Sequence, residues 1–280
     1  MTAAVVEMTV STAALLALQG VAGVGVLPPH LRIRPRLITV GDQEVQVSAE
    51  ERDALTEAGL LREGEPDRDA ILLLRSLAYP DAELNITLGG ADRPDTFVCL
   101  ARSQQLVAAA ARCGDEVTID AYVGLDEAAL VELVTTTFER YLFDTDEHDF
   151  TNTMDGATVR LGEVYDVMCR DEPQQWTPAL RRVGVPADVA AALRRCETDT
   201  LRRGEVAAYI NHENGRTAGE SIVRATTTPQ EAVLTSFASD NIGDRWLTVE
   251  PYETTRIKRF IVAAIRSVPD KAWFTHCRTD

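Results

Sequence analysis

The chain has 280 residues, 45% of them hydrophobic, so it can bury a sizeable core without metals or disulfides, which argues against disorder. Its 28 Lys and Arg residues against 44 Asp and Glu residues give a net charge of −16. This charge repels phosphate backbones and anionic membranes, so neither nucleic acid binding nor membrane insertion is expected. The five cysteines lie far apart without a Cys-x-x-Cys pair, which predicts reduced thiols in a cytoplasmic protein.

The first long apolar stretch, residues 13–27, is similar to the core of a signal peptide. Glu7 is the only charge before it, Gln19 interrupts it, and it is shorter than the roughly 20 residues that span a bilayer. We interpret it as a buried helix with a glycine-rich exit. The glycines at 20, 23 and 25 follow this helix, whereas a dinucleotide fingerprint precedes one, so they indicate a loop.

Two further helices are predicted before the first strands of a sheet. Ser48 and Glu51 have the spacing of a capping box, which begins a helix through about Ala58. Asp67 is a typical N-cap for a helix that continues to Tyr79, where the proline that follows ends it.

From Asp81 the hydrophobic pattern changes to a period of two, which is typical of strands. Four consecutive strands are predicted, at residues 82–88, 96–102, 105–112 and 116–122. Short connections make them an antiparallel meander, with one seven-residue loop, GGADRPD, between the first two. An amphipathic helix follows from Asp126 to about Tyr141.

The same order of elements recurs in the second half of the chain. Helices are predicted at residues 157–169, 178–183 and 186–201, strands at 206–212, 220–225, 231–238 and 245–250, and a last helix at 252–267. Asn214-Gly215 is a strong hairpin signal. Helices segregated from antiparallel strands predict an α+β fold, with one sheet flanked by helices at both ends.

The two strand-helix units can be superimposed in sequence at one offset of 130 residues. Tyr122 then matches Tyr252, and the helix residues Leu130 and Val131 match Phe260 and Ile261. We interpret this as an internal duplication, although coincidence between two ordinary amphipathic units stays open. The expectation is a single domain, 1–280, made of an N-terminal half, 1–143, and a C-terminal half, 144–280.

The sequence offers little sign of catalytic chemistry. No P-loop, HExxH or GxSxG motif is present, and the histidines fall in predicted loops, at a strand end or near the terminus, so we predict no catalytic residues, no cofactor and no metal. The segment from Asp144 to Asp149 combines carboxylates with His148, but it lacks the glycine and glutamate of a calcium loop. A solvated acidic linker is the favoured interpretation. A metal-dependent or hydrolytic enzyme using acidic residues near His148 is the alternative, and a scaffold that self-associates through an edge strand is a third.

Tryptophans are candidates for anchoring a protein partner, because buried aromatics dominate interfaces. Trp246 starts a predicted strand and Trp273 follows the last helix, so core packing is expected for both. Trp176 lies in the polar stretch DEPQQWTP, where a half-exposed anchor and a core position are equally open.

Several segments resemble the EspG family of the actinobacterial type VII (ESX) secretion system. Its N-terminal half has a helix ending in Leu-x-x-x-Gly-Leu-Leu, a second helix, Pro-Asp and a strand. The matching positions are Leu55, Gly59, Leu60, Leu61, Pro80, Asp81 and Leu84. The opening VEMTVS, residues 6–11, is similar to the family's first strand. The run SVPDKAWF, residues 267–274, resembles its ending, with Lys271 where a glycine is common.

This resemblance implies a quasi-twofold α+β fold with a central sheet and a C-terminal helical bundle. It also implies a cytoplasmic, non-enzymatic chaperone that binds PE/PPE heterodimers at the tip of the PPE subunit, keeps them soluble and directs them to secretion. The free protein would be a monomer or a weak homodimer.

In the family, the first-hairpin loop and the helical bundle contact the substrate. The matching stretches here are Gly89 to Asp95 and roughly residues 157–201. The partner-binding candidates are therefore Gly89, Gly90, Ala91, Asp92, Arg93, Pro94 and Asp95, together with Asp171, Gln174 and Trp176, chosen for expected exposure. A seven-residue loop is longer than a hairpin needs and longer than the turn of the second hairpin, which suggests a function, although tolerated loop drift explains it equally well.

Overall fold

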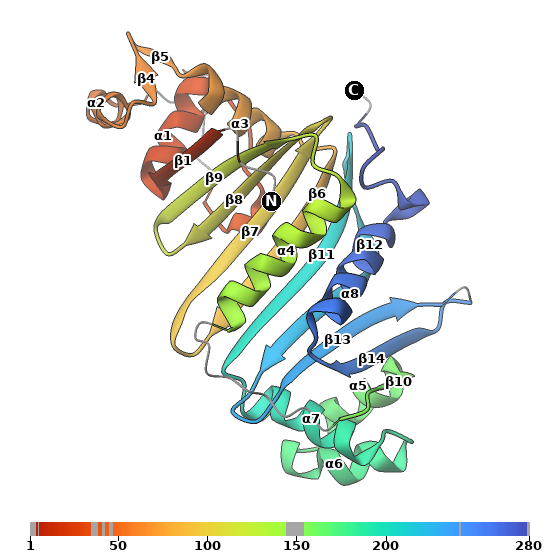
Figure 1. Ribbon diagram of the computed structural model, residues 1–280. Coiled ribbons are helices and arrows are strands. Elements are labelled where there is room, and N and C mark those ends of the chain that lie inside the picture. The colour runs from red at the N-terminus through yellow and green to blue at the C-terminus, as the bar shows by residue number, and fades with distance from the viewer. Residues whose placement is uncertain are drawn as a thin grey trace.

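The computed structural model describes residues 4, 6–34, 39–40, 43–44, 47–143, 154–240 and 242–278, and it has the α+β organisation predicted from the sequence (Figure 1). The strands are β1 (Val6–Ser11), β2 (Thr39–Val40), β3 (Gln43–Glu44), β4 (Leu61–Arg62), β5 (Glu65–Pro66), β6 (Ala82–Gly90), β7 (Arg93–Ser103), β8 (Leu106–Cys113), β9 (Glu116–Val123), β10 (Ala157–Arg160), β11 (Arg202–His212), β12 (Gly215–Thr227), β13 (Ala232–Ser239) and β14 (Arg245–Pro251). The helices are α1 (Thr12–Ala22), α2 (Ala49–Glu57), α3 (Arg68–Ala78), α4 (Glu127–Leu142), α5 (Leu161–Arg170), α6 (Pro173–Arg182), α7 (Ala187–Thr198) and α8 (Thr254–Arg266). Within these described ranges, no helix has the length and apolar character needed to cross a membrane.

Ten strands form one sheet in the order β1-β9-β8-β7-β6-β11-β12-β13-β14-β10. The order is symmetric about the central pair: counted outward from β6 and β11, each half contributes its meander and then the strand that precedes its first helix. All neighbouring strands are antiparallel, and β6 pairs with β11 from Ala82–Ile210 to Gly90–Arg202. The sheet therefore has the quasi-twofold arrangement that the offset of 130 residues suggested. The division into halves 1–143 and 144–280 stays a proposal.

Helices cover the two faces of the sheet in different ways. Helices α4 and α8 lie side by side on one face and bury the central hydrophobic cluster, which includes Leu84, Val206, Phe138 and Ile261 (Figure 1). On the opposite face, α1 and α3 pack over the first half, with Leu18 and Leu74 fully buried. Helices α5, α6 and α7 form a separate bundle over the second half.

Local signals at the helix starts are confirmed in atomic detail. The Ser48 hydroxyl accepts from the Glu51 amide at 3.2 Å, while the Glu51 carboxylate accepts from the Ser48 amide at 2.8 Å, so the capping box is complete. The Asp67 side chain caps α3, and the Asp126 side chain caps α4 at 2.8 Å. Each cap satisfies amides that have no partner inside the helix.

Several boundaries differ from the sequence prediction in the second half: β11 and β12 begin at Arg202 and Gly215, whereas strands were expected from residues 206 and 220. Residues 157–160 were expected to begin a helix, but they form β10 and pair with β14, because the open edge of β14 offers unpaired backbone groups. Helix α6 begins at Pro173, five residues before the expected start, with Pro178 inside it. Its first proline needs no amide partner at the helix start, and the helix buries Trp176, Ala179 and Leu180 although Pro178 removes one of its hydrogen bonds.

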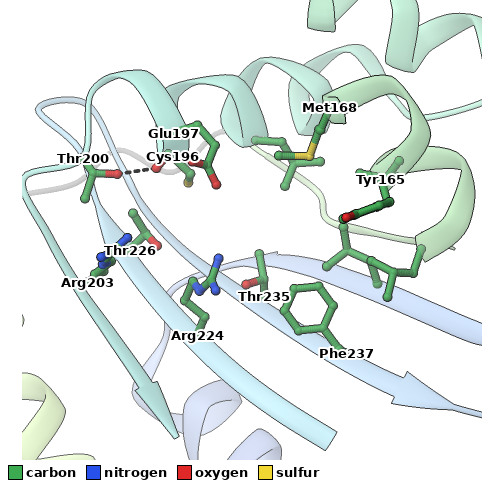
Figure 2. A pocket seen from close by; sticks show the side chains of 14 residues that line it. Tyr165, Met168, Cys196, Glu197, Thr200, Arg203, Arg224, Thr226, Thr235 and Phe237 are labelled. Atoms are coloured by element: carbon green, nitrogen blue, oxygen red, sulfur yellow. Dashed lines mark hydrogen bonds between the residues drawn. The ribbon is translucent and has the colours of Figure 1, made fainter. Parts of the chain in front are cut away.

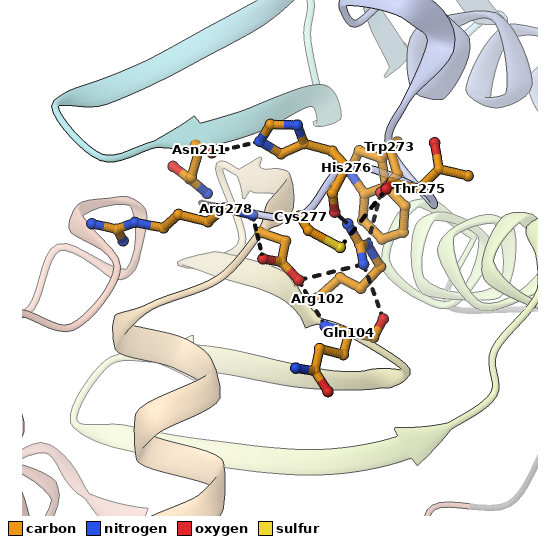
Figure 3. A network of polar contacts seen from close by, with 9 residues as sticks. Arg102, Gln104, Asn211, Trp273, Thr275, His276, Cys277 and Arg278 are labelled. Atoms are coloured by element: carbon orange, nitrogen blue, oxygen red, sulfur yellow. Dashed lines mark hydrogen bonds and ion pairs between the residues drawn. The ribbon is translucent and has the colours of Figure 1, made fainter. Parts of the chain in front are cut away.

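The C-terminal segment fastens the two halves together through a buried polar network (Figure 3). Arg102 is only 3% exposed and donates to the carbonyls of Trp273 (2.7 Å) and Gln104 (2.9 Å) and to that of His276. Its guanidinium lies 3.5 Å from the Asp81 carboxylate, which also accepts from the amides of Gln104 and residue 278. Trp273 is fully buried, as predicted, and its indole N–H donates to the Glu83 carbonyl at 3.0 Å.

Replacing Arg102 by Leu is expected to lower the free energy of unfolding by about 3–5 kcal/mol, because the Asp81 carboxylate would remain buried without its cation. Equilibrium urea unfolding measures this loss. The matched control is Arg170→Leu, which removes an arginine from an exposed pair with Asp166 and should have no measurable effect. Equal effects of the two substitutions would show that the network around Arg102 does not hold the fold.

The turn after α8 explains why a glycine suits position 271. Asp270 and Lys271 have φ angles of 57° and 55°, in the left-handed region that side chains with a Cβ disfavour. Lys271 is exposed, so its side chain contributes little packing.

We therefore expect Lys271→Gly to raise the free energy of unfolding by roughly 0.5–1 kcal/mol, the relief of the left-handed conformation less the greater entropy of glycine in the unfolded chain. Thermal unfolding monitored by circular dichroism provides the measurement. Lys271→Ala keeps the Cβ and should not stabilise the protein. A stabilisation of the same size by alanine would assign the effect to the lost lysine charge instead.

Candidate partner-binding site

A pocket of about 370 Å³ opens between the sheet and the helices α5 and α7 (Figure 2). Its lining side chains come from both helices and from the four strands β11 to β14. They are Leu161, Val164, Tyr165, Met168, Leu193, Cys196, Glu197, Thr200, Arg203, Arg224, Thr226, Thr235, Phe237 and Leu247. The lower limit of ordinary ligand pockets is about 300 Å³, so this one can take a large apolar side chain.

The pocket combines an apolar wall with cationic side chains on the strands. Arg224 is half-buried and is neutralised by Glu205, whose carboxylate accepts from the guanidinium at 2.7 Å. Arg203 is exposed, and it makes no ion pair with any residue in the described part of the chain. Glu197 on α7 also lines the pocket. The lining therefore offers an unpaired cation beside apolar surface, in a chain that is strongly acidic overall.

The lining does not have the composition of a catalytic site. Burial, together with the negative charges of Glu231 and Glu197, raises the pKa of the Cys196 thiol to about 12, so it is not a nucleophile at neutral pH. The Thr200 hydroxyl is occupied by donating to the Cys196 carbonyl. None of the described lining residues is a histidine, the most common general base. The pocket therefore offers apolar and charged surface for binding.

The end of the first hairpin lies next to this pocket, but its shape differs from the prediction. Strand β6 continues to Gly90 and β7 begins at Arg93, so the connection is two residues long, and the expected seven-residue loop is wrong. The register shifts between Leu88 and Gly90, which leaves Pro94 and Asp95 in a bulge. A bulge tolerates a proline because the extra residue needs no ladder hydrogen bond. The second hairpin also has a two-residue connection between His212 and Gly215, so the proposed difference in loop length does not exist.

The hairpin end is fixed to the second half of the sheet. The Asp92 carboxylate accepts from the Arg202 guanidinium at 2.7 Å, and this hydrogen bond is the main cause that lowers the pKa of Asp92. The Ala91 amide donates to the Leu201 carbonyl at 3.2 Å. Gly89 pairs in register with Arg203, which links the hairpin end directly to the pocket lining.

The three candidates in the helical bundle lie elsewhere. Trp176 is 7% exposed and packs inside the bundle, and its indole N–H donates to the Asp171 carbonyl at 2.8 Å. The expectation of exposure is therefore wrong for Trp176, half met for Asp171, which is partly buried, and met for Gln174. Gln174 and Trp176 belong to α6, and Asp171 immediately precedes the N-cap of that helix. None of the three lines the pocket.

Sequence reasoning did not single out the pocket residues, of which Tyr165, Met168 and Arg203 are the most informative. The spacing of Tyr165 and Met168 along α5 is that of one helix face, but such a stripe usually indicates core packing. Arg203 was placed just before the predicted strand 206–212, and nothing in its neighbourhood marked it. Only the packing of α5 and α7 over β11 brings the three together.

The acidic segment from Asp144 to Asp149, with His148, lies outside the described residues. Across the described part of the chain, no three His, Cys, Asp or Glu side chains are grouped so that they could hold a metal ion.

Comparison with known proteins connects this architecture to one family. The sequence profile of the EspG family matches residues 11–263. Two ESX-5 secretion-associated proteins EspG5, from Mycobacterium marinum and Mycobacterium tuberculosis, are each 22% identical to this chain over 302 residues. Each alignment covers 97% of this chain and 97% of the relative. The structure of the M. tuberculosis type VII secretion system chaperone EspG5 in complex with a PE25-PPE41 dimer superimposes with a TM-score of 0.81 at 19% identity, and covers 97% of this chain and 100% of that one. The resemblance noted in the sequence is thus confirmed, and this chain belongs to the EspG family.

Proposed function

We propose that this protein is a cytoplasmic chaperone of a type VII secretion system, which binds a PE/PPE heterodimer in a 1:1:1 complex. The observation that carries the proposal is the match of the whole fold to a chaperone whose structure contains a PE–PPE dimer. The profile match over residues 11–263 supports the same conclusion independently of the coordinates. The tip of the PPE subunit is the part of the partner that we expect to be bound.

The proposed contact surface combines the hairpin end, Gly89–Asp95, with the bundle α5–α7. Both lie beside the start of β11, so one partner can contact them together. Asp171 and Gln174 are the bundle candidates that solvent reaches, whereas Trp176 supports α6 from inside. The pocket between α5 and the sheet adds apolar surface to this region.

A chaperone role follows from the hydrophobic effect. If the tip of the partner exposes apolar side chains, covering them removes that surface from water and prevents self-association of the partner. Each 100 Å² of apolar surface covered contributes about 2.5 kcal/mol. We assign no catalytic step and no cofactor to this function, so release would come from competition at the secretion machinery.

The proposal is tested by co-expressing the chain with a tagged PE/PPE heterodimer of the same organism and by measuring the composition of the purified complex. We expect a 1:1:1 complex with the unmodified chain. Asp95→Arg, at the exposed end of the first hairpin, should reduce the recovered chaperone by about tenfold or more, since it places a bulky cation in the contact surface.

The matched control is Glu213→Arg, at the exposed end of the second hairpin. Because β6 and β11 are antiparallel, this hairpin lies at the opposite end of the sheet. The Glu213→Arg substitution should leave the amount of recovered chaperone unchanged. Equal recovery of the Asp95→Arg variant, correctly folded, would refute the hairpin contact. Failure of the unmodified chain to bind any PE/PPE pair of its organism would refute the function itself.

A further inference from the structure

The two halves of the sheet bury their first helices to very different extents. In the first half, α1 follows β1 and buries Leu15, Ala17, Leu18 and Gln19 against the sheet. In the second half, α5 follows β10 at the equivalent place in the strand order, and it buries only Val164. The first helix of the first half therefore packs closely against the sheet, whereas the first helix of the second half leaves space between itself and the sheet.

The pocket occupies the space that α5 leaves. Val167 and Met168 on α5 are half-buried, and Tyr165 remains 64% exposed. Figure 2 shows Phe237 of β13 across the pocket from Tyr165 and Met168. Phe237 is also half-buried, so apolar surface on both sides faces the opening. This cavity lacks the van der Waals contacts that α1 makes with the sheet at the equivalent place, and their absence lowers the stability of the fold.

The charges around the pocket point to the chemistry of the missing group. Arg203 is exposed and unpaired within the described residues, whereas the neighbouring Arg202 is used to hold Asp92. Arg224, the second cation of the lining, is already neutralised by Glu205. Glu197 is the acidic residue of the lining, and no ion pair joins it to Arg203 in the described structure. The Asp95 carboxylate and the Arg203 guanidinium both lie beside Gly89, without an ion pair between them. Among the described residues, one guanidinium without an ionic partner therefore stands beside an apolar opening.

Resting on the proposed function, we infer that this pocket receives one large apolar side chain from the tip of the bound partner, and that Arg203 pairs with a carboxylate next to that side chain. The apolar group supplies affinity by filling the space between α5 and the sheet. The carboxylate supplies specificity, because a guanidinium binds a carboxylate in a bidentate manner and rejects a cation. The occupant is thus an apolar residue with an acidic neighbour at the tip of the partner.

The pocket also lies where the proposed contact surface requires it. Arg203 pairs in register with Gly89, so a group bound at Arg203 adjoins the hairpin end. Tyr165 and Met168 project from α5, the first helix of the bundle. A partner that contacts both the hairpin and the bundle passes over the opening.

Two pairs of variants test the inference, with a purified PE/PPE heterodimer of the same organism that the unmodified chain binds. Met168→Trp fills the pocket, whereas Leu72→Trp adds the same ring at an exposed position on α3. Arg203→Glu reverses the free charge, whereas Arg52→Glu makes the same change at an exposed position on α2. Binding is measured by calorimetry at low and high salt, after circular dichroism and thermal unfolding confirm that each variant is folded.

We expect Met168→Trp and Arg203→Glu each to weaken binding by about tenfold or more, with Leu72→Trp and Arg52→Glu within about threefold of the unmodified chain. The effect of Arg203→Glu should diminish at high salt, and an acidic-to-lysine change at the partner's tip should restore its binding. Unchanged binding of Met168→Trp would refute the pocket, and unchanged binding of Arg203→Glu would refute the carboxylate. Since the unmodified chain must bind before either comparison is made, these results are distinct from a failure of the proposed function.

Discussion

The antiparallel pairing of β6 with β11 is the contact on which the rest of the architecture depends. It joins two meanders into one ten-stranded sheet over the register from Ala82–Ile210 to Gly90–Arg202. Because the two strands run in opposite directions, the first and second hairpins extend to opposite ends of the sheet. The first hairpin thereby reaches the start of β11 and the end of α7. Without this pairing, the hairpin end and the helical bundle would have no fixed relation to each other.

The C-terminal segment reinforces the same junction from the other end of β6. Its carbonyls accept from Arg102 on β7, its indole donates to β6, and His276 bonds the Asn211 carbonyl of β11 at 2.7 Å. The side chains of Arg102, Trp273 and His276 are thus occupied with backbone partners, and they hold strands together. The cysteine in the pocket lining has a thiol whose pKa is raised to about 12 by burial, which makes it unreactive. The polar groups described in these two places serve structure and binding.

The two halves of the quasi-twofold fold differ in how closely their first helices pack on the sheet. The first half packs α1 tightly and contributes stability, whereas the second half leaves α5 partly unpacked beside a pocket. An underfilled position is tolerable here because ten strands and the pair α4–α8 already bury a large core. This difference in packing places the pocket on the second half of the sheet.

The sequence by itself determined the order of the helices and of the two four-stranded meanders, the capped helix starts at Ser48 and Asp67, and the repeat at an offset of 130 residues. These features depend on local hydrogen bonds and on hydrophobic periodicity, which neighbouring residues encode. Only the tertiary structure decided that residues 157–160 are a strand and that Trp176 is buried, because each depends on a distant segment. The bulge at Pro94 depends on the strand register of the first hairpin, which the hydrophobic pattern did not define. The pocket belongs to this second group: its lining spans residues 161–247, and only the packing of α5 and α7 on the sheet brings them together.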